Sequence, residues 1–373
     1  MKNLNVLIKP ASSHCNMRCK YCFYADVSNS REIKSCGIMS EETADMILNR
    51  IEMDLDSGDR IQFIFQGGEP TLAGLPFFRG FIGKVKKWNK DIEVSYALQT
   101  NGLFIGKDWC EFLKENNFLV GVSLDILSDC HDEVRIDAEG KGTYKRVINT
   151  ISLFDKYGVE YNVLCTLTNS VARYPQKVWN RIIQLGIKYV QFTPCLGELN
   201  LESTSPYALT PKRFTSFYTA IFNLWYDSYK NGRVISIKLF DDILNLMVLG
   251  RPTLCGMNGT CQPQLVVEAD GSVYPCDFYC LDEYKLGNLK ENGVFELLSG
   301  DTVQKFADRP HKRPELCNSC QYLAFCGGNC KRMQKEICCT DNDNYCGYRD
   351  FLDNCGAELN KIANEIIHKT RRC

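Results

Sequence analysis

Short apolar runs alternate with amphipathic segments along the first 200 residues of the chain. The apolar runs have strand length and are rich in β-branched and aromatic residues, whereas the segments between them space apolar residues three and four apart, as in helices. The predicted strands are Asn5–Ile8, Ile61–Phe65, Ile92–Leu98, Phe118–Ser123, Val159–Leu167 and Tyr189–Thr193. The predicted helices are Ser40–Asp56, Leu75–Trp88, Asp108–Asn116, Thr143–Tyr157 and Pro175–Leu185. This alternation predicts parallel strands with right-handed crossovers, in an α/β partial (β/α)6 TIM-like barrel.

The pattern changes after a long predicted helix at Thr210–Asn231. Leu265–Glu268 and Val273-Tyr274 flank an Asp-Gly turn and predict a β-hairpin. Glu315–Tyr348 is dense in Cys, Gly and Asn with little periodicity, so something other than a hydrophobic core must hold it. Asp350–Arg371 is a plausible closing helix. We therefore predict a barrel over 1–233, a cysteine-rich domain over 234–349 and a C-terminal helix over 350–373 that packs on the barrel.

Charge and hydropathy exclude several classes of partner. Lys and Arg number 44 against 45 Asp and Glu, so no long-range field favours nucleic acid or an anionic membrane surface. The N-terminus lacks the apolar core of a signal peptide, and no run reaches the ~18 apolar residues of a membrane span. We expect a cytoplasmic protein with neither nucleic acid nor membrane as partner.

Cysteine usage is unusual for such a chain. The 21 cysteines do not suit a disulfide scaffold, because the cytosol keeps thiols reduced, and an odd total cannot pair completely. Three lie between residues 15 and 22, and most others fall between 255 and 355. Such grouping indicates metal or cluster ligation.

The first group, Cys15-x3-Cys19-x2-Cys22, lies on a loop soon after the first strand. Three thiolates can hold three irons of a cubane and leave the fourth iron open, as in catalytic metal sites. The alternative is a zinc knuckle, for which His14 is the local candidate for a fourth ligand.

Together with Gly67-Gly68-Glu69-Pro70 after the next strand, this motif resembles the radical SAM superfamily. The resemblance implies a [4Fe–4S] cluster whose open iron binds S-adenosylmethionine, with Gly67–Pro70 at the methionine amino group. The positions that match cofactor contacts are Tyr21, Gly68, Glu69, Ser123, Arg135 and Leu196. Taken alone, the Gly-Gly-Glu-Pro segment is a common turn and Arg135 a solvated side chain.

The C-terminal spacing of cysteines resembles the SPASM domain, which carries two auxiliary [4Fe–4S] clusters. By this resemblance one cluster is held by Cys255, Cys261, Cys276 and Cys330, and the other by Cys317, Cys320, Cys326 and Cys346. Two structural zinc sites are the alternative. Cys338 and Cys339 lie inside the ligand gap, so either competes with Cys346 for the assignment. Cys346 is preferred because Tyr345-Cys346 precedes a helix-like segment. The remaining cysteines, at 36, 110, 130, 165, 195, 280, 338, 339, 355 and 373, are interpreted as ordinary thiols.

Asp277 directly follows a predicted cluster ligand. Burial and a neighbouring anionic cluster both favour a base poised nearer neutrality. The alternative is a turn-capping aspartate after the hairpin.

Several segments, among them Leu7–Ser13, Phe65–Leu75 and Cys255–Cys261, resemble the anaerobic sulfatase-maturating enzymes over nearly the whole chain. The resemblance implies oxidation of a Cys or Ser in a Cys-x-Pro-x-Arg-type sulfatase motif to Cα-formylglycine. A 5′-deoxyadenosyl radical takes hydrogen from Cβ, Asp277 acts as base, and the auxiliary clusters accept the second electron. It also implies an unfolded or nascent sulfatase as substrate and a flavodoxin- or ferredoxin-type electron donor. His14 departs from the family's small residue.

Two alternatives stay open. A SPASM maturase that crosslinks or epimerises another ribosomal peptide shares both cysteine regions, but we expect no leader-binding domain before a motif that starts at residue 15. A non-catalytic iron–sulfur or zinc module disagrees with the Gly-Gly-Glu-Pro segment and the absence of a basic patch.

Overall fold

A computed structural model describes residues 1–199, 205–308, 313–339 and 344–370. Their contacts define two compact units that interleave along the chain. The first comprises Met1–Ser123, Asp132–Tyr161 and Pro263–Arg309, and the second Leu124–His131, Asn162–Gln262 and Pro310–Cys373. This division does not test the domain ranges expected from the sequence, which stay a prediction.

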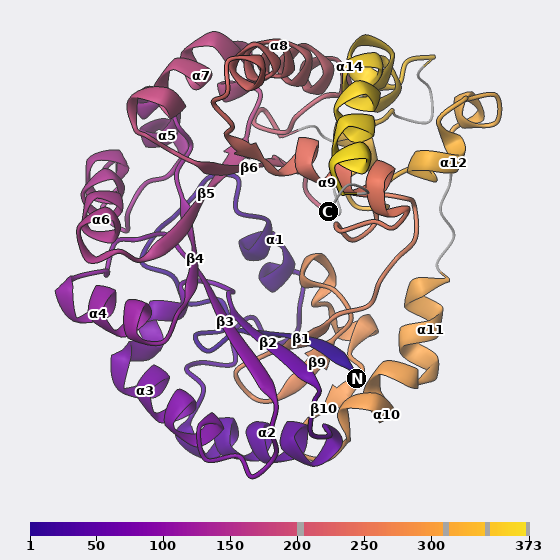
Figure 1. The fold of residues 1–373 in the computed structure, drawn as a ribbon. Coiled ribbons are helices and arrows are strands. Elements are labelled where there is room, and N and C mark those ends of the chain that lie inside the picture. The colour runs from indigo at the N-terminus through magenta and orange to yellow at the C-terminus, as the bar shows by residue number, and fades with distance from the viewer. Residues whose placement is uncertain (200–204, 309–312, 340–343, 371–373) are drawn as a thin grey trace. The chain divides into compact units, whose positions relative to one another are not determined.

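The first unit is built on parallel strands in the order of the chain. β1 (Asn3–Ile8), β2 (Arg60–Phe65), β3 (Glu93–Thr100) and β4 (Leu119–Ser123) pair successively. Their connecting helices are α1 (Phe23–Asn29), α2 (Glu41–Asp54), α3 (Gly74–Val85), α4 (Lys107–Glu115) and, after β4, α6 (Tyr144–Tyr157). Figure 1 shows α2, α3 and α4 along one face of these strands and α1 on the other. The carboxyl ends of the strands therefore meet at one edge, where chemistry gathers in such folds.

Alternating apolar residues explain why these strands are buried. Phe63 and Phe65 of β2 are fully buried and pack edge-on against Phe81 of α3, with ring centroids 5.1 Å apart in both pairs. Helix α2 begins where Ser40 accepts a hydrogen bond from the Thr43 amide, as its capping sequence predicts.

The predicted hairpin forms and also extends this sheet. β8 (Leu265–Val267) and β9 (Ser272–Tyr274) are antiparallel, with Gly271 at φ +89° in the turn, and β10 (Gly287–Asn288) pairs with β9. β8 also pairs in parallel with β1. Because that pairing joins residues about 260 positions apart, the local pattern could not reveal it. Helices α10 (Val294–Ser299) and α11 (Asp301–Ala307) follow.

The second unit contains most of parallel strand β5 (Glu160–Leu167), together with β6 (Tyr189–Pro194) and β7 (Ser236–Ile237). Its main helices are α7 (Pro175–Gln184), α8 (Pro211–Lys230), α9 (Lys238–Leu249) and α14 (Gly347–Thr370), and α5 (Ser128–Val134) contains residues of both units. α14 packs along α8, where Phe351 meets Phe214. The predicted end of this last helix, Arg371, lies outside the described residues, as does Cys373.

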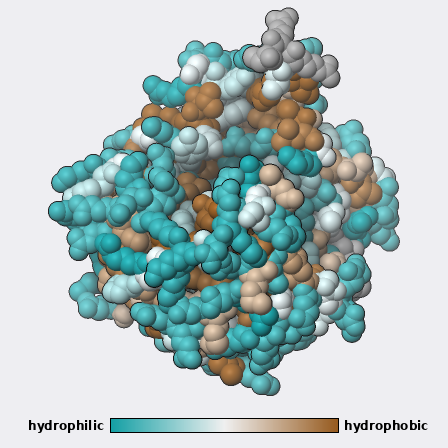
Figure 2. All heavy atoms as spheres, turned by 60° about the horizontal axis from the view of Figure 1, so that its bottom comes forward, coloured by the Kyte–Doolittle hydropathy of each residue, from teal (hydrophilic) through white to brown (hydrophobic). Residues whose placement is uncertain are grey.

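The cysteine-rich segment has little regular structure. Its helices α12 (Leu323–Cys326) and α13 (Gln334–Ile337) have four residues each. In the described parts of the chain no helix is long and apolar enough to cross a membrane. Hydrophilic residues predominate on the face shown in Figure 2, and hydrophobic ones form smaller patches there.

Candidate active site

The loop between β1 and α1 brings the first three cysteines to one cavity. Cys15, Cys19 and Cys22 all border a cavity of about 630 Å³, and none of the three is in a disulfide. Burial raises the pKa of the Cys15 thiol to about 11, so a metal that binds it must displace a proton. A roomy cavity with three thiols and no disulfide fits a cluster held by three cysteines.

The Gly-Gly-Glu-Pro segment packs directly against this loop. The Gly68 amide donates to Ser12 O at 2.8 Å, and the Glu69 amide donates to His14 O at 2.8 Å. A Cβ at Gly68 would lie only 2.1 Å from His14 O, so only glycine allows this approach. Gly68 also borders the cysteine cavity.

Glu69 joins the ends of two strands. Its buried carboxylate accepts hydrogen bonds from the amide and hydroxyl of Thr71, the hydroxyl of Thr100 and the amide of Asn101, at 2.7–3.1 Å. Burial raises the pKa of Glu69 despite these bonds. Hydrogen bonds within the chain therefore occupy much of the Glu69 carboxylate's capacity to accept hydrogen bonds. The expected contact of Glu69 with the cofactor stays a prediction.

The opposite flank of the loop is held by the segment around Arg135. The Arg18 amide donates to Ile136 O at 2.8 Å, and the Lys20 amide to Val134 O at 3.0 Å. The guanidinium of Arg135 lies over the ring of Tyr21, 5.3 Å from its centroid, and Arg135 is 7% exposed rather than solvated. Ser123 ends β4 in this unit, whereas Leu196 follows β6 in the other, and their cofactor contacts stay predictions.

The first auxiliary set is only partly brought together within one unit. Cys255, Cys261 and Cys330 belong to the second unit, and Cys276 belongs to the first. The segments that contain Cys255, Cys261 and Cys330 pack closely against each other. A Cβ at Gly256, next to Cys255, would lie 2.8 Å from Cys330 Cβ. Burial, followed by the nearby charges of Cys330 and Cys261, raises the pKa of the Cys255 thiol.

The second auxiliary set is fully assembled. Cys317, Cys320, Cys326 and Cys346 border one small cavity of about 10 Å³ with apolar side chains. Cys338 borders it as well. In the part of the chain that the structure describes, no three His, Cys, Asp or Glu side chains surround a point that fits a single metal ion.

Asp277 lies in a buried charged network that sequence reasoning missed. It opens the short 3-10 helix Asp277–Tyr279 after β9, and its Oδ2 accepts a hydrogen bond from Gln66 Nε2 at 2.5 Å. Lys9 Nζ lies 2.6 Å from Oδ1. Lys9 follows β1 and Gln66 follows β2, so three strand ends converge on this carboxylate. The sequence argument considered burial and like charge, and the structure adds a cation.

Lys9 is itself fully buried among acceptors. Its Nζ lies 3.5 Å from the centroid of the Tyr24 ring and 3.4 Å from Cys280 Sγ. Burial alone would lower the pKa of Lys9, but Asp277 and the other acidic groups around it outweigh burial and raise the pKa well above its usual value. These acidic groups therefore favour the charged form of Lys9 beside Asp277.

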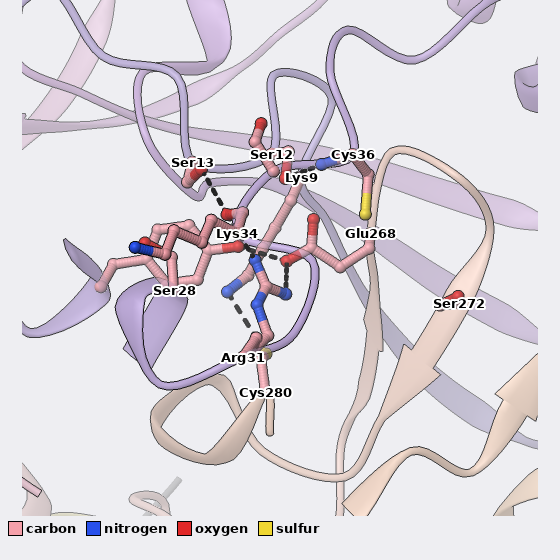
Figure 3. Close-up of polar contacts among 12 residues, drawn as sticks. Lys9, Ser12, Ser13, Ser28, Arg31, Lys34, Cys36, Glu268, Ser272 and Cys280 are labelled. Atoms are coloured by element: carbon pink, nitrogen blue, oxygen red, sulfur yellow. Dashed lines mark hydrogen bonds and ion pairs between the residues drawn. The ribbon is translucent and has the colours of Figure 1, made fainter. Parts of the chain in front are cut away.

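A second buried ion pair supports the first. Arg31 Nη1 lies 2.8 Å from Glu268 Oε1, which also accepts a hydrogen bond from the Tyr24 hydroxyl. Figure 3 shows Arg31 and Glu268 facing each other, with Lys9 and Cys280 in the same cluster. Because Tyr24 borders the cysteine cavity and stacks under Lys9, it connects that cavity with the Asp277 network. In the sequence, the available signals for this charged network were the positions of Lys9 and Gln66 directly after predicted strands.

Both oxygens of the Asp277 carboxylate have buried partners. Oδ2 accepts the hydrogen bond from Gln66, and Oδ1, itself buried, forms the ion pair with Lys9. The residue as a whole is 8% exposed. The arrangement suits a base whose carboxylate is oriented by Gln66 and charge-compensated by Lys9.

Comparisons with known proteins agree with this geometry. The sequence profile of the radical SAM superfamily matches residues 10–171, and that of the SPASM iron-sulfur cluster-binding domain matches residues 255–321. The cysteine-type anaerobic sulfatase-maturating enzyme of Clostridium novyi is 40% identical over 99% of this chain and 100% of its own length. The chain belongs to the anaerobic sulfatase-maturating enzymes.

A solved structure of this enzyme family supports the assignment. Native anSMEcpe with bound AdoMet and Cp18Cys peptide is 39% identical, with a TM-score of 0.89 over 98% of this chain and 99% of that chain. The serine-type enzyme of Bacteroides thetaiotaomicron is more distant, at 28% identity over 99% of this chain and 93% of its own length. The predicted family and fold class, a radical SAM TIM-like α/β fold with a C-terminal SPASM domain, are confirmed. The [4Fe–4S] clusters and S-adenosylmethionine, which the radical SAM and SPASM domains imply, are also confirmed as cofactors of this sulfatase-maturating enzyme.

Proposed function

We propose that this enzyme oxidises the cysteine of a Cys-x-Pro-x-Arg-type sulfatase segment to Cα-formylglycine. The observation that carries the proposal is the Asp277 carboxylate, oriented by Gln66 and paired with Lys9, in the unit that also holds the three-cysteine cavity. The names of the related enzymes and the peptide bound by anSMEcpe support it.

The residues that would hold the cofactors follow from the fit of their thiols. Cys15, Cys19 and Cys22 would hold the catalytic cluster, and the two predicted sets of four cysteines would hold the auxiliary clusters. When bound, these groups supply a 5′-deoxyadenosyl radical for hydrogen abstraction from Cβ and accept the second electron. Gly68 provides close backbone approach, and Arg135 provides a cation for a carboxylate.

Asp277 performs the proton step. The substrate –CH2SH loses one hydrogen atom from Cβ, one proton from sulfur and one electron, which leaves a thioaldehyde. The Asp277 carboxylate takes the proton, while Gln66 keeps it in orientation and Lys9 compensates its charge. Hydrolysis of the thioaldehyde then gives the aldehyde and releases hydrogen sulfide.

We further propose a preference for cysteine over serine substrates, because identity to the cysteine-type enzyme is 40% and to the serine-type enzyme 28%. The substrate would be an unfolded or nascent sulfatase in the cytoplasm, and a flavodoxin- or ferredoxin-type protein would deliver the electron.

The test is anaerobic incubation of the reconstituted enzyme with matched Cys and Ser peptides of this motif, followed by mass spectrometry. We expect aldehyde mainly from the Cys peptide. In Asp277→Asn we expect aldehyde formation to fall about 10²–10⁴-fold while cleavage of S-adenosylmethionine persists. Unchanged aldehyde formation in Asp277→Asn would refute the base assignment, and a different modification of the peptide would refute the function.

A further inference from the structure

Two carboxylates lie near the buried ammonium group of Lys9. Asp277 Oδ1 is 2.6 Å from Lys9 Nζ, and the second carboxylate belongs to Glu268. Lys9 follows β1 and Glu268 follows β8, two strands that pair in parallel with Ile8 opposite Val267. The Lys9 amide also donates to Val267 O at 2.8 Å. Lys9 and Glu268 are therefore neighbours across the ends of paired strands, and Figure 3 shows their side chains in one cluster.

Glu268 has an oxygen with which Lys9 can pair. Glu268 is fully buried, and among the described residues no hydrogen bond reaches its Oε2. Burial would raise the pKa of Glu268, but Lys9 and Arg31 outweigh it and the pKa is lowered. A buried carboxylate that loses one counter-charge attracts the next one, because an uncompensated buried charge is costly. Without Arg31, Lys9 is the cation left to Glu268, and Glu268 then competes with Asp277 for it.

Arg31 and Tyr24 hold the other oxygen of Glu268. Arg31 Nη1 lies 2.8 Å from Glu268 Oε1, and Arg31 Nη2 donates to Lys34 O at 3.3 Å, so the guanidinium is fixed between Glu268 and the loop backbone. The Tyr24 hydroxyl donates to the same Oε1, and the face of the Tyr24 ring lies 3.5 Å from Lys9 Nζ. Tyr24 thus links the two ion pairs and offers Lys9 a neutral surface that attracts a cation.

We propose that Arg31 and Tyr24 are positioning residues for the proton step, because they hold Glu268 and thereby leave Lys9 to Asp277. They act through Glu268 and Lys9, and no bond of their own forms or breaks. The inference rests on the proposed function of Asp277 as the base, and it adds the residues that keep the cation beside that base.

The test measures aldehyde formed per methionine released from S-adenosylmethionine, in the full-length reconstituted enzyme with the Cys peptide. Unfolded or unloaded protein contributes to neither product, so this coupling ratio separates positioning from folding. The variants are Arg31→Met, Tyr24→Phe, and each of these combined with Glu268→Gln. Gln keeps an oxygen that accepts from Tyr24 and removes the competing negative charge. Arg60→Met is the matched control, because Arg60 forms an ion pair on the exposed surface.

We expect the coupling ratio to fall about 10-fold in Arg31→Met, because Lys9 is then divided between two carboxylates, and to fall less in Tyr24→Phe, which loses one neutral donor. Adding Glu268→Gln should restore the ratio in both, and Arg60→Met should leave it unchanged. If Arg31→Met binds no iron, Tyr24→Phe decides, because it removes only a hydroxyl.

An unchanged ratio in a loaded Arg31→Met or Tyr24→Phe enzyme would overturn the proposal for that residue. A reduced ratio that Glu268→Gln fails to restore would overturn the competition between the two carboxylates. Neither result bears on the base itself, because that assignment is tested by Asp277→Asn. Aldehyde formation that persists unchanged in Asp277→Asn would instead refute the proposed function on which this inference rests.

Discussion

At the scale of single residues, the site depends on buried charges that compensate one another. Lys9 is fully buried between Asp277, Cys280 and the Tyr24 ring, and Arg31 pairs with a buried Glu268. A buried pair costs desolvation of both ions, so removing one partner leaves an uncompensated charge. Of these side chains, Lys9 is the one that pairs directly with the Asp277 carboxylate.

Lys9→Met should uncouple the proton step from cofactor cleavage. Without Lys9, the Asp277 carboxylate loses the cation that is paired with it and that helps to position it, so we expect aldehyde formation to fall about 10²-fold while S-adenosylmethionine is still cleaved. Product and methionine are quantified from the same anaerobic reaction. Equal aldehyde formation in both proteins would contradict a role for Lys9.

Arg31→Met should remove a pH-dependent part of the stability. Burial would raise the pKa of Glu268, but Lys9 and Arg31 outweigh it and the pKa is lowered. The stabilisation is therefore present above about pH 4.3, the usual pKa of Glu, and is lost as pH falls through the lower folded value. We expect a loss of about 3–5 kcal/mol near neutral pH by anaerobic urea unfolding, and a smaller loss in acid.

The control for that measurement is Arg60→Met. Arg60 pairs with Glu93 at 2.7 Å, but both side chains are more than half exposed. Such surface pairs contribute about 0–1 kcal/mol. If Arg60→Met and Arg31→Met were equally destabilising, the buried pair would not have the importance assigned to it.

At the scale of elements, strand ends could be predicted and long-range contacts could not. Apolar runs and helical spacing located β1 to β6, and the residues after these strands drew attention to Gln66 and Ser123. The partners of Asp277, in contrast, could not be predicted from the sequence. Lys9 lies 268 positions away, and only the parallel pairing of β8 with β1 brings that segment near it. Periodicity contains no information on which strand ends meet.

Gly68→Ala should separate the Gly-Gly-Glu-Pro segment from the cysteine loop. The new Cβ would lie 2.1 Å from a backbone oxygen, His14 O, which cannot rotate away. We expect a loss of about 1–3 kcal/mol together with reduced iron content and cofactor cleavage. Gly80→Ala in α3 is the control, because nothing lies within 4 Å of its Cβ, and it should be neutral or stabilising by about 0.5–1 kcal/mol. Normal iron loading in Gly68→Ala would show that the loop adjusts.

At the scale of the whole molecule, cysteine spacing revealed chemistry that the fold alone does not. Radical SAM and SPASM motifs could be read because ligand spacing is local, and the same holds for Cys317, Cys320 and Cys326. The choice of Cys346 over Cys338 was made from the sequence, because a helix-like segment follows Tyr345-Cys346, and it stays a prediction. The structure places Cys346 directly before α14, with the Arg349 amide donating to its sulfur. Local motifs thus identify the chemistry, and the fold shows the surroundings in which each predicted ligand lies.

The auxiliary clusters should also act as the core of the cysteine-rich segment. Residues 313–339 contain only four-residue α-helices and one short 3-10 helix, Glu315–Cys317, so ligand bonds must replace missing secondary structure and apolar packing. We expect anaerobic chelation of iron to increase amide hydrogen exchange strongly across 313–339. Exchange in β2 and β3 should change little, because the strands there are paired on both sides and packed against the phenylalanines of α3. The measurement is hydrogen exchange with mass spectrometry on loaded and chelated enzyme. Equal protection of 313–339 in both forms would mean that the segment folds without its clusters, and a uniform loss that includes β2 and β3 would mean that the clusters stabilise the whole chain.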